Sequence, residues 1–332
     1  MARRRLAPHE FRTKYVIILS AAIEILPPDI SRYRAGNTGV EYVHALDSGK
    51  PGPNVMVQAL THGNEYCGAI ALDYLFRERI APIQGTLTLA FANVAAFARF
   101  DPANPDKSRC IDEDYNRVWD DAVLGGSRDS VELRRARELQ PFVDAADYLL
   151  DLHSMTERCR PIMVCGTRDK GAEFARRVGV PADLLIDTGH AAGLRMRDRG
   201  AFGDPQSPKN ALLIECGQHW EKSSVEVAID TSLRFLTVVG SVAADWAKPR
   251  LRIKPPATQR VIRVTEAVTV QSMKFRFARP WKGLEVVSDA GTVVATDGER
   301  TWRTPYAGCV MVMPSIVHLK PGGTAVRLGR YD

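Results

Sequence analysis

A histidine and a glutamate three residues apart are the side chains in this sequence best suited to metal chemistry. His62 and Glu65 lie in a turn between a predicted strand at residues 55–60 and a predicted helix at residues 69–80. An imidazole nitrogen and a carboxylate oxygen at this spacing can bind one Zn²⁺. The same pair also suits a helix start, where a carboxylate interacts favourably with the helix dipole. The motif alone therefore leaves metal binding and helix capping both open.

Two further polar residues each follow an apolar segment. His153 ends the segment at residues 148–152, and Glu215 ends the segment at residues 211–214. His153 is the best candidate for a third ligand, although a histidine at a buried strand end is often only a hydrogen-bonded core group. A carboxylate at the end of a buried strand is costly unless it is paired or functional. Glu215 therefore suits either a salt-bridged structural group or a general base for a metal-activated water.

Residues 108–117 contain several side chains that can bind an anion. Arg109, Asn116 and Arg117 have the donor groups needed to clamp a carboxylate and to stabilise an oxyanion. The alternative is a surface loop in which both arginines pair with the acidic residues 112–114.

The elements that must position these residues alternate between strands and helices. Strands are predicted at residues 55–60, 86–92, 148–152 and 211–214, and helices at residues 69–80, 131–145 and 223–246, the last with Ser223 or Ser224 as N-cap. This alternation predicts a largely parallel sheet with helices on both faces. Because the carboxyl ends of parallel strands line one crevice, His62, Asn93, His153 and Glu215 are expected to meet there.

The pattern changes after a stretch rich in proline and charge at residues 248–256. Short β-rich segments follow it, at residues 260–270, 284–287, 292–295, 309–313 and 325–328. We therefore predict an α/β catalytic domain over residues 1–248, a linker at 249–257 and a small all-β domain over 258–332.

Taken together, the motifs resemble the succinylglutamate desuccinylase/aspartoacylase family, which is related to the zinc carboxypeptidases. They are His62-Gly63-Asn64-Glu65, Arg109 with Asn116-Arg117, Asp151-Leu152-His153 and Glu215-Cys216-Gly217. Their order matches the family, as does the seven-residue step from Arg109 to Asn116. The resemblance covers roughly residues 40–220, and it implies a mostly parallel mixed sheet like that of the zinc carboxypeptidases.

The resemblance also implies a role for each residue. Three ligands would hold one zinc ion per chain, namely His62, Glu65 and His153. Glu215 would act as general base and then protonate the leaving amine, and Arg109 would stabilise the tetrahedral oxyanion. Asn116 and Arg117 would hold the α-carboxylate of a small N-acyl amino acid, and the C-terminal β domain would cover the active site. The nearest alternative is a zinc carboxypeptidase that acts on small peptides.

The sequence departs from the family pattern in two places. Aspartoacylase has an arginine shortly before the catalytic glutamate that reads an acidic side chain, whereas residues 202–210 contain only Lys209 as a cation. A preference for N-acetylaspartate is therefore not implied. His219 lies four residues after Glu215, where the family more often has small residues or proline. It is a candidate to contact either the substrate or one of the metal-binding residues.

Composition narrows the class of protein. The chain has 332 residues, of which 45% are apolar and 25% are charged, and this excludes disorder and coiled coil. Apolar runs are too short for a transmembrane helix. The basic start at residues 1–5 is followed by an apolar stretch, residues 16–26, that contains Glu24 and lacks a cleavage site, so we predict a cytoplasmic protein. The six cysteines lack metal-site spacing and are expected to be reduced.

The net charge of +6 raises the question of nucleic-acid binding. Residues 1–250 contain 32 basic and 33 acidic residues, whereas residues 251–332 contain 13 and 6. With no recognisable nucleic-acid motif, this basic segment favours small carboxylates as partners. Lys274 follows Met273, as in biotinyl carrier domains, which leaves a carrier role as a remote alternative. The sequence is compatible with a homo-oligomer.

Overall fold

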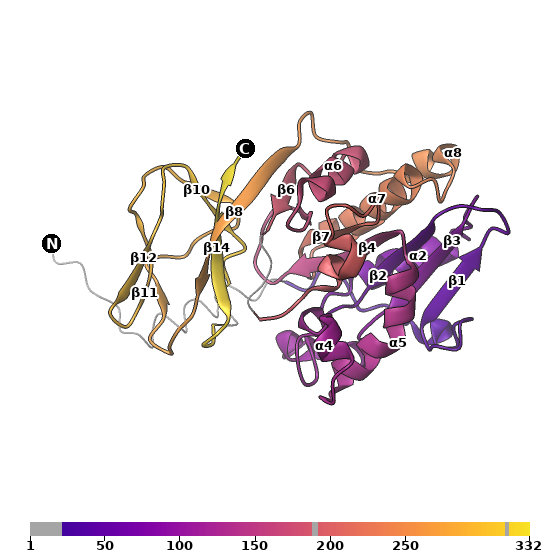
Figure 1. Ribbon diagram of the computed structural model, residues 1–332, viewed down its shortest axis with the longest axis horizontal. Coiled ribbons are helices and arrows are strands. Elements are labelled where there is room, and N and C mark those ends of the chain that lie inside the picture. The colour runs from indigo at the N-terminus through magenta and orange to yellow at the C-terminus, as the bar shows by residue number, and fades with distance from the viewer. Residues whose placement is uncertain (1–21, 188–191, 316–318) are drawn as a thin grey trace.

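An eleven-stranded mixed sheet runs through the molecule, with helices on both faces and a three-stranded sheet at one end (Figure 1). The computed structural model describes residues 22–187, 192–315 and 319–332. The strand order in the large sheet is β1-β3-β2-β4-β7-β5-β6-β8-β14-β13-β10. Its strands are β1 Val43–Asp47, β2 Asn54–Ala59, β3 Thr86–Phe91, β4 Tyr148–Met155, β5 Ile162–Val164, β6 Asp183–Ile186, β7 Asn210–Gln218, β8 Arg260–Thr269, β10 Glu285–Val287, β13 Cys309–Val312 and β14 Thr324–Tyr331.

The helices belong to the part of the chain before β8. The α-helices are α2 Cys67–Arg77, α3 Val94–Phe97, α4 Asp121–Leu124, α5 Val131–Ala145, α6 Asp169–Val178, α7 Lys222–Val238 and α8 Ala244–Ala247. The 3-10 turns are η1 Ser31–Tyr33, η2 Pro105–Ser108, η3 Tyr115–Arg117, η4 Met196–Asp198, η5 Gly200–Phe202 and η6 Lys248–Arg250.

The central strands β3, β2, β4 and β7 are parallel, and β6 is parallel to both β5 and β8. Strands β1 and β5 pair antiparallel with their neighbours β3 and β7. The predicted α/β class, with a mostly parallel mixed sheet flanked by helices and a small β part, is thus confirmed.

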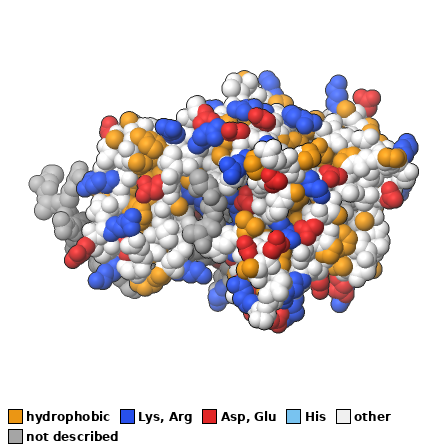
Figure 2. Space-filling model, in the orientation of Figure 1, with side chains coloured by type: hydrophobic (Ala, Val, Ile, Leu, Met, Phe, Trp, Pro, Cys, Tyr) orange, Lys and Arg blue, Asp and Glu red, His pale blue; other side chains and the backbone are white. Residues whose placement is uncertain are grey.

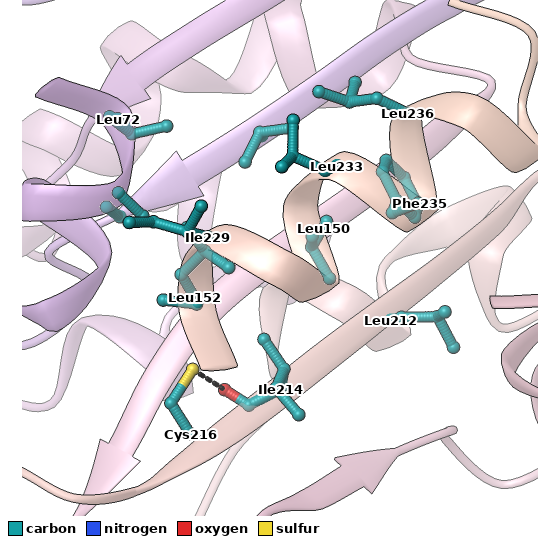
Figure 3. Packing of buried hydrophobic residues seen from close by; sticks show 14 of the residues in the cluster. Leu72, Leu150, Leu152, Leu212, Ile214, Cys216, Ile229, Leu233, Phe235 and Leu236 are labelled. Atoms are coloured by element: carbon teal, nitrogen blue, oxygen red, sulfur yellow. Dashed lines mark hydrogen bonds between the residues drawn. The ribbon is translucent and has the colours of Figure 1, made fainter. Parts of the chain in front are cut away.

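Apolar side chains cover both faces of the central strands, which is why these strands read as nearly continuous hydrophobic runs. On one face, Leu152 and Ile214 pack beneath α2 and α7, together with Ile229 and Leu233 (Figure 3). On the other face, Leu149 packs against the buried side of α5. Because apolar side chains occupy both faces of these strands, the polar residues lie at the strand ends.

Helix α7 ends earlier than the sequence predicted. It stops at Val238 rather than at residue 246, because Gly240 turns the chain with a φ of +73° before the short α8. The predicted serine N-cap is also wrong. The N-cap is Glu221, and Ser224 Oγ instead donates to the Glu221 carbonyl at 2.7 Å.

The large sheet continues into the C-terminal part through β8. This strand pairs parallel with β6 on one side and antiparallel with β14 on the other. Each β-rich segment expected after residue 258 contains a strand, and the small sheet β12-β11-β9 adds β9 Arg276–Phe277 and β12 Arg300–Arg303 to β11 Val293–Asp297. The domain boundaries at residues 249–257 remain a prediction.

Basic and acidic side chains are interspersed over the face of the molecule shown in Figure 2. Among the described residues, the structure has no helix with both the length and the apolar character needed to cross a membrane. The N-terminal segment used to predict the cellular location lies mostly outside the described residues.

Candidate active site

The loop after β2 carries the first two candidate ligands and is held by close packing at Gly63. A Cβ atom at this position would lie 2.3 Å from the Ser108 carbonyl oxygen and 2.4 Å from the backbone carbon of Ala96. The Gly63 amide donates to the Arg109 carbonyl at 3.1 Å. Glycine is therefore required here because two backbones approach closely, and this contact fixes Arg109 beside the loop.

His62, Glu65 and His153 come together in a buried cluster. His62 Nδ1 lies 2.7 Å from Glu65 Oε1, and His153 Nδ1 lies 2.9 Å from Glu65 Oε2. The three residues are 4%, 2% and 2% exposed, and one donor atom from each lies within 4.8 Å of the others. The helix-capping interpretation does not hold, because α2 begins after Tyr66 without a side-chain cap.

A carboxylate lies against the far nitrogen of each imidazole. Asp151 Oδ2 is 2.7 Å from His153 Nε2, and Asp114 Oδ1 is 3.1 Å from His62 Nε2. When Asp151 accepts the Nε2–H group of His153, the Nδ1 lone pair of that imidazole faces Glu65. Two imidazole nitrogens, one carboxylate oxygen and outer carboxylate partners form a donor set that fits Zn²⁺.

A short hydrogen-bond chain orients Asp151. Gln58 Nε2 donates to Thr61 Oγ1 at 2.9 Å, and Thr61 Oγ1 donates to Asp151 Oδ1 at 2.8 Å. All three residues are fully buried. The two oxygens of Asp151 therefore have separate partners, Thr61 and His153, and the imidazole is fixed in one orientation.

Neighbouring charges shift the pKa values of the buried cluster strongly. Burial by itself raises the pKa of Glu65, but the charges of His62 and His153 hold that pKa well below its usual range. Burial likewise lowers the pKa of His153, but Asp151 and Glu65 raise it well above its usual value. The protein thus compensates each buried charge with an opposite one.

Arg109 lies against the cluster. Its NH1 donates to Glu65 Oε1 at 3.1 Å, and its NH2 lies 2.8 Å from His62 Nε2 and 3.2 Å from Asp114 Oδ2. Burial lowers the pKa of Arg109, but Asp114 and Glu65 outweigh this effect and raise it. The predicted ion pair between Arg109 and an acidic residue of the loop is present, with Asp114. The loop is not simply a surface loop, however, because the guanidinium of Arg109 faces the candidate ligands His62 and Glu65.

Glu215 lies on β7 beside His153 on β4, its partner in the parallel register. The next residues form a bulge, in which Gly217 has a φ of +117°. Glu215 Oε2 is buried and has no hydrogen-bond partner among the described residues. Burial raises the pKa of Glu215 to about 7, a value suited to proton exchange near neutral pH.

Asn116 and Arg117 lie in η3, close to Arg109 in the chain. Asn116 is buried, and its Oδ1 accepts the Met196 amide at 2.9 Å. Arg117 NH1 donates to the Asn116 carbonyl at 2.6 Å, and burial lowers the pKa of Arg117 to about 10.

Asn93 does not join this group. Its Oδ1 caps α3 by accepting the Ala96 amide at 3.3 Å, and its Nδ2 donates to Glu132 Oε1 at 3.0 Å. Glu132 in turn accepts backbone amides of residues 111–113. The expectation that Asn93 shares the crevice is therefore wrong, since it supports the loop that carries Arg109.

The contact of Asp114 with His62 was not anticipated from the sequence, whereas His219 was expected to contact the substrate or a metal ligand. Asp114 lies against His62, and the signal for it was its place between Arg109 and Asn116 in the motif. His219 Nδ1 lies 2.8 Å from Ser154 Oγ, and the Ser154 amide donates to Glu65 Oε2 at 3.2 Å. His219 is thus one residue removed from a candidate ligand.

The fold and the cluster together describe an α/β protein with a buried His–Glu–His group able to hold a metal ion. The family model described as the succinylglutamate desuccinylase/aspartoacylase catalytic domain matches residues 51–236. The chain belongs to this family. A search of curated proteins found no match.

Solved structures share the fold across most of the chain. Succinylglutamate desuccinylase from Vibrio parahaemolyticus has a TM-score of 0.62 at 16% identity, covering 88% of this chain and 86% of that one. Murine aminoacylase 3 has a TM-score of 0.59 at 18% identity, covering 85% and 96%. A product-bound ectoine utilization protein from Ruegeria pomeroyi has a TM-score of 0.59 at 15% identity, covering 88% and 89%.

Proposed function

We propose that this protein is a zinc-dependent hydrolase that cleaves the amide bond of a small N-acyl amino acid. The observation that carries the proposal is the buried cluster of His62, Glu65 and His153, with Glu215 on the neighbouring strand. Family membership supports the reaction class, and the related structures include a desuccinylase and an aminoacylase.

The three ligands would hold one zinc ion per chain. Zinc in such a site lowers the pKa of a water towards ~7 and polarises a carbonyl oxygen. Asp151 and Asp114 keep both imidazoles turned towards Glu65, which prepares the site for the ion.

Glu215 and Arg109 carry out the remaining chemistry. The carboxylate of Glu215 takes a proton from the attacking water and later delivers it to the leaving amine nitrogen. Its raised pKa suits both directions of transfer. Arg109 faces the cluster and stabilises the oxyanion of the tetrahedral intermediate. Asn116 and Arg117 bind the α-carboxylate of the substrate.

The test is a panel of N-acetyl, N-succinyl and N-formyl amino acids, together with small peptides, given to the zinc-loaded protein. Glu215→Gln removes the proton acceptor and should lower kcat by about 10²–10⁴ while zinc remains bound, as measured by metal analysis. Glu226→Gln, a glutamate exposed on α7, is the matched control and should not change kcat.

Full activity of Glu215→Gln would contradict the proposed mechanism. Hydrolysis of peptides at rates equal to those of N-acyl amino acids would instead favour the carboxypeptidase alternative.

A further inference from the structure

Strand β7 continues beside β4 past the proposed general base, Glu215 (Figure 1). The register passes from His153↔Glu215 to Met155↔Gln218, so β4 advances by two residues where β7 advances by three. A bulge of this kind bends a strand and changes the direction of the side chains that follow it. The amide of His219, the next residue, then donates to the Met155 carbonyl at 2.9 Å. His219 is therefore fixed beside the end of β4.

The imidazole of His219 contacts two hydroxyl groups, one on each side of Met155. His219 Nδ1 lies 2.8 Å from Ser154 Oγ, and His219 Nε2 lies 3.2 Å from Thr156 Oγ1. His219 is 1% exposed and Ser154 is 3% exposed. Because a hydroxyl group can donate or accept a hydrogen bond, both contacts are compatible with either tautomer of a neutral imidazole. The ring therefore holds Ser154 in place from the side of β7.

Ser154 connects this imidazole to a candidate metal ligand. The Ser154 amide donates to Glu65 Oε2 at 3.2 Å. The same carboxylate also contacts the side chains of His62, His153 and Arg109. Two of these side chains are candidate metal ligands themselves, and the third is proposed to stabilise the oxyanion. The Ser154 amide has no second task of this kind, so it can hold the Glu65 carboxylate when the site is in use.

The residue after His219 contacts the same ligand loop on the other side of Glu65. Trp220 Nε1 donates to the carbonyl of Asn64, which directly precedes Glu65, at 3.2 Å. Both residues are buried, since Trp220 is 4% exposed and Asn64 is fully buried. Consecutive residues at the end of β7 thus contact the backbone before Glu65 and, through Ser154, its carboxylate.

We propose that His219 is a positioning residue for the candidate metal site. By holding Ser154, it directs the Ser154 amide at Glu65 and keeps that carboxylate in the orientation needed to bind the ion. The proposal rests on the proposed function, because it assigns His219 a role toward the zinc site. A buried histidine that served only to pair neighbouring polar groups would make its two hydroxyl contacts equivalent for metal binding. The positioning role makes only the contact with Ser154 important.

Two substitutions separate the two nitrogens of the ring. The side-chain amide of asparagine occupies the region of the histidine Nδ1 atom, whereas the amide of glutamine, which is one carbon further out, occupies the region of Nε2. His219→Asn can therefore keep the contact with Ser154, and His219→Gln can keep only the contact with Thr156. Both variants carry the same functional group, so they differ mainly in which contact survives.

Zinc affinity is measured for each variant by competition with a chelator. We expect His219→Gln to weaken zinc binding by about 10–100-fold, the usual effect of an outer partner of a metal ligand, and His219→Asn to stay close to wild type. Ser154→Ala, which removes the hydroxyl group but keeps the amide, should weaken zinc binding to a similar extent. Thr156→Val is the matched control and should leave zinc affinity unchanged. Because Ser154→Ala and His219→Gln break the same contact, their combination should not exceed the larger single effect.

Thermal melting of the metal-free variants separates positioning from stability. His219→Asn and His219→Gln should melt at similar temperatures although their zinc affinities differ. If either variant fails to fold, Ser154→Ala and Thr156→Val give the same comparison from the other side of the two contacts. Equal zinc affinities within either pair of folded variants would overturn the positioning role.

The behaviour of wild type distinguishes this role from the proposed function. If wild type binds zinc but hydrolyses no N-acyl amino acid, the proposed reaction fails, while a difference in zinc affinity within each pair still supports the positioning role. If wild type hydrolyses these substrates and zinc affinities are equal within either pair, the positioning role fails alone. Wild type that binds no zinc would overturn both.

Discussion

Residues 1–250 and residues 251–332 differ in how they treat charge. Residues 1–250 are balanced, with 32 basic and 33 acidic residues, and the charged groups of the candidate site are buried in opposed pairs such as Asp151 with His153. Residues 251–332 contain 13 basic and 6 acidic residues, and there Arg279 and Arg300 stack on Trp281 and Trp302. The comparison teaches that total charge says little about function, whereas buried charge with specific partners says a great deal.

The largest difference between the two parts is expected when one arginine is removed from each. Arg109→Ala should lower kcat by about 10²–10³, the usual cost of losing one oxyanion contact, while zinc stays bound. Arg279→Ala, which removes an exposed pair with Glu285, should leave kcat unchanged. Kinetics and metal analysis on both variants check this, and loss of zinc from Arg109→Ala in proportion to activity would refute the assigned role.

A smaller effect is expected when the buried aspartate beside His153 is replaced, with a buried aspartate of residues 251–332 as the control. Asp151→Asn weakens the hold on the His153 imidazole and should reduce zinc affinity by about 10–100-fold, measured by competition with a chelator. Asp297→Asn, at a buried carboxylate that accepts the Gln271 amide, should leave zinc affinity unchanged. Equal affinities in the two variants would mean that Asp151 is only structural.

One glycine in each part allows the same comparison to be made with the free energy of unfolding. A methyl group at Gly63 would meet backbone atoms at 2.3 and 2.4 Å, so Gly63→Ala should cost about 1–3 kcal/mol and displace Arg109. Gly298 has open space but a φ of +63°, so Gly298→Ala should cost about 1–2 kcal/mol without loss of activity. Urea unfolding and kinetics separate the two cases, and full activity in a destabilised Gly63→Ala would show that the loop contact does not position Arg109.

Much of the fold was predictable because local signals were strong. The helix at residues 131–145 agrees with α5, since Ser130 caps it by accepting the Leu133 amide at 3.0 Å. Strands β5 and β6 were missed because three or four apolar residues give no usable period. The end of α7 was missed because a left-handed turn at Gly240 outweighs the helical pattern beyond it.

The candidate site was predictable where a motif and a strand end coincided. His62, Glu65 and His153 are brought together, while their roles, like that of Glu215, remain proposals. Contacts that depend on distant pairing could not be read from spacing. Arg327 comes within reach of Asp187 only because β14 joins the sheet beside β8.

The position of β8 determines what would happen if the chain were cut before this strand. This strand supplies the parallel partner of β6, from Asp183↔Arg260 to Ile186↔Arg263. A chain that ended before Arg260 would leave the backbone N–H and C=O groups on that edge of β6 unpaired. Such an unpaired edge can pair with strands of other molecules. The pairing of β8 with β6 thus covers a sheet edge that would otherwise be open to pairing with other chains.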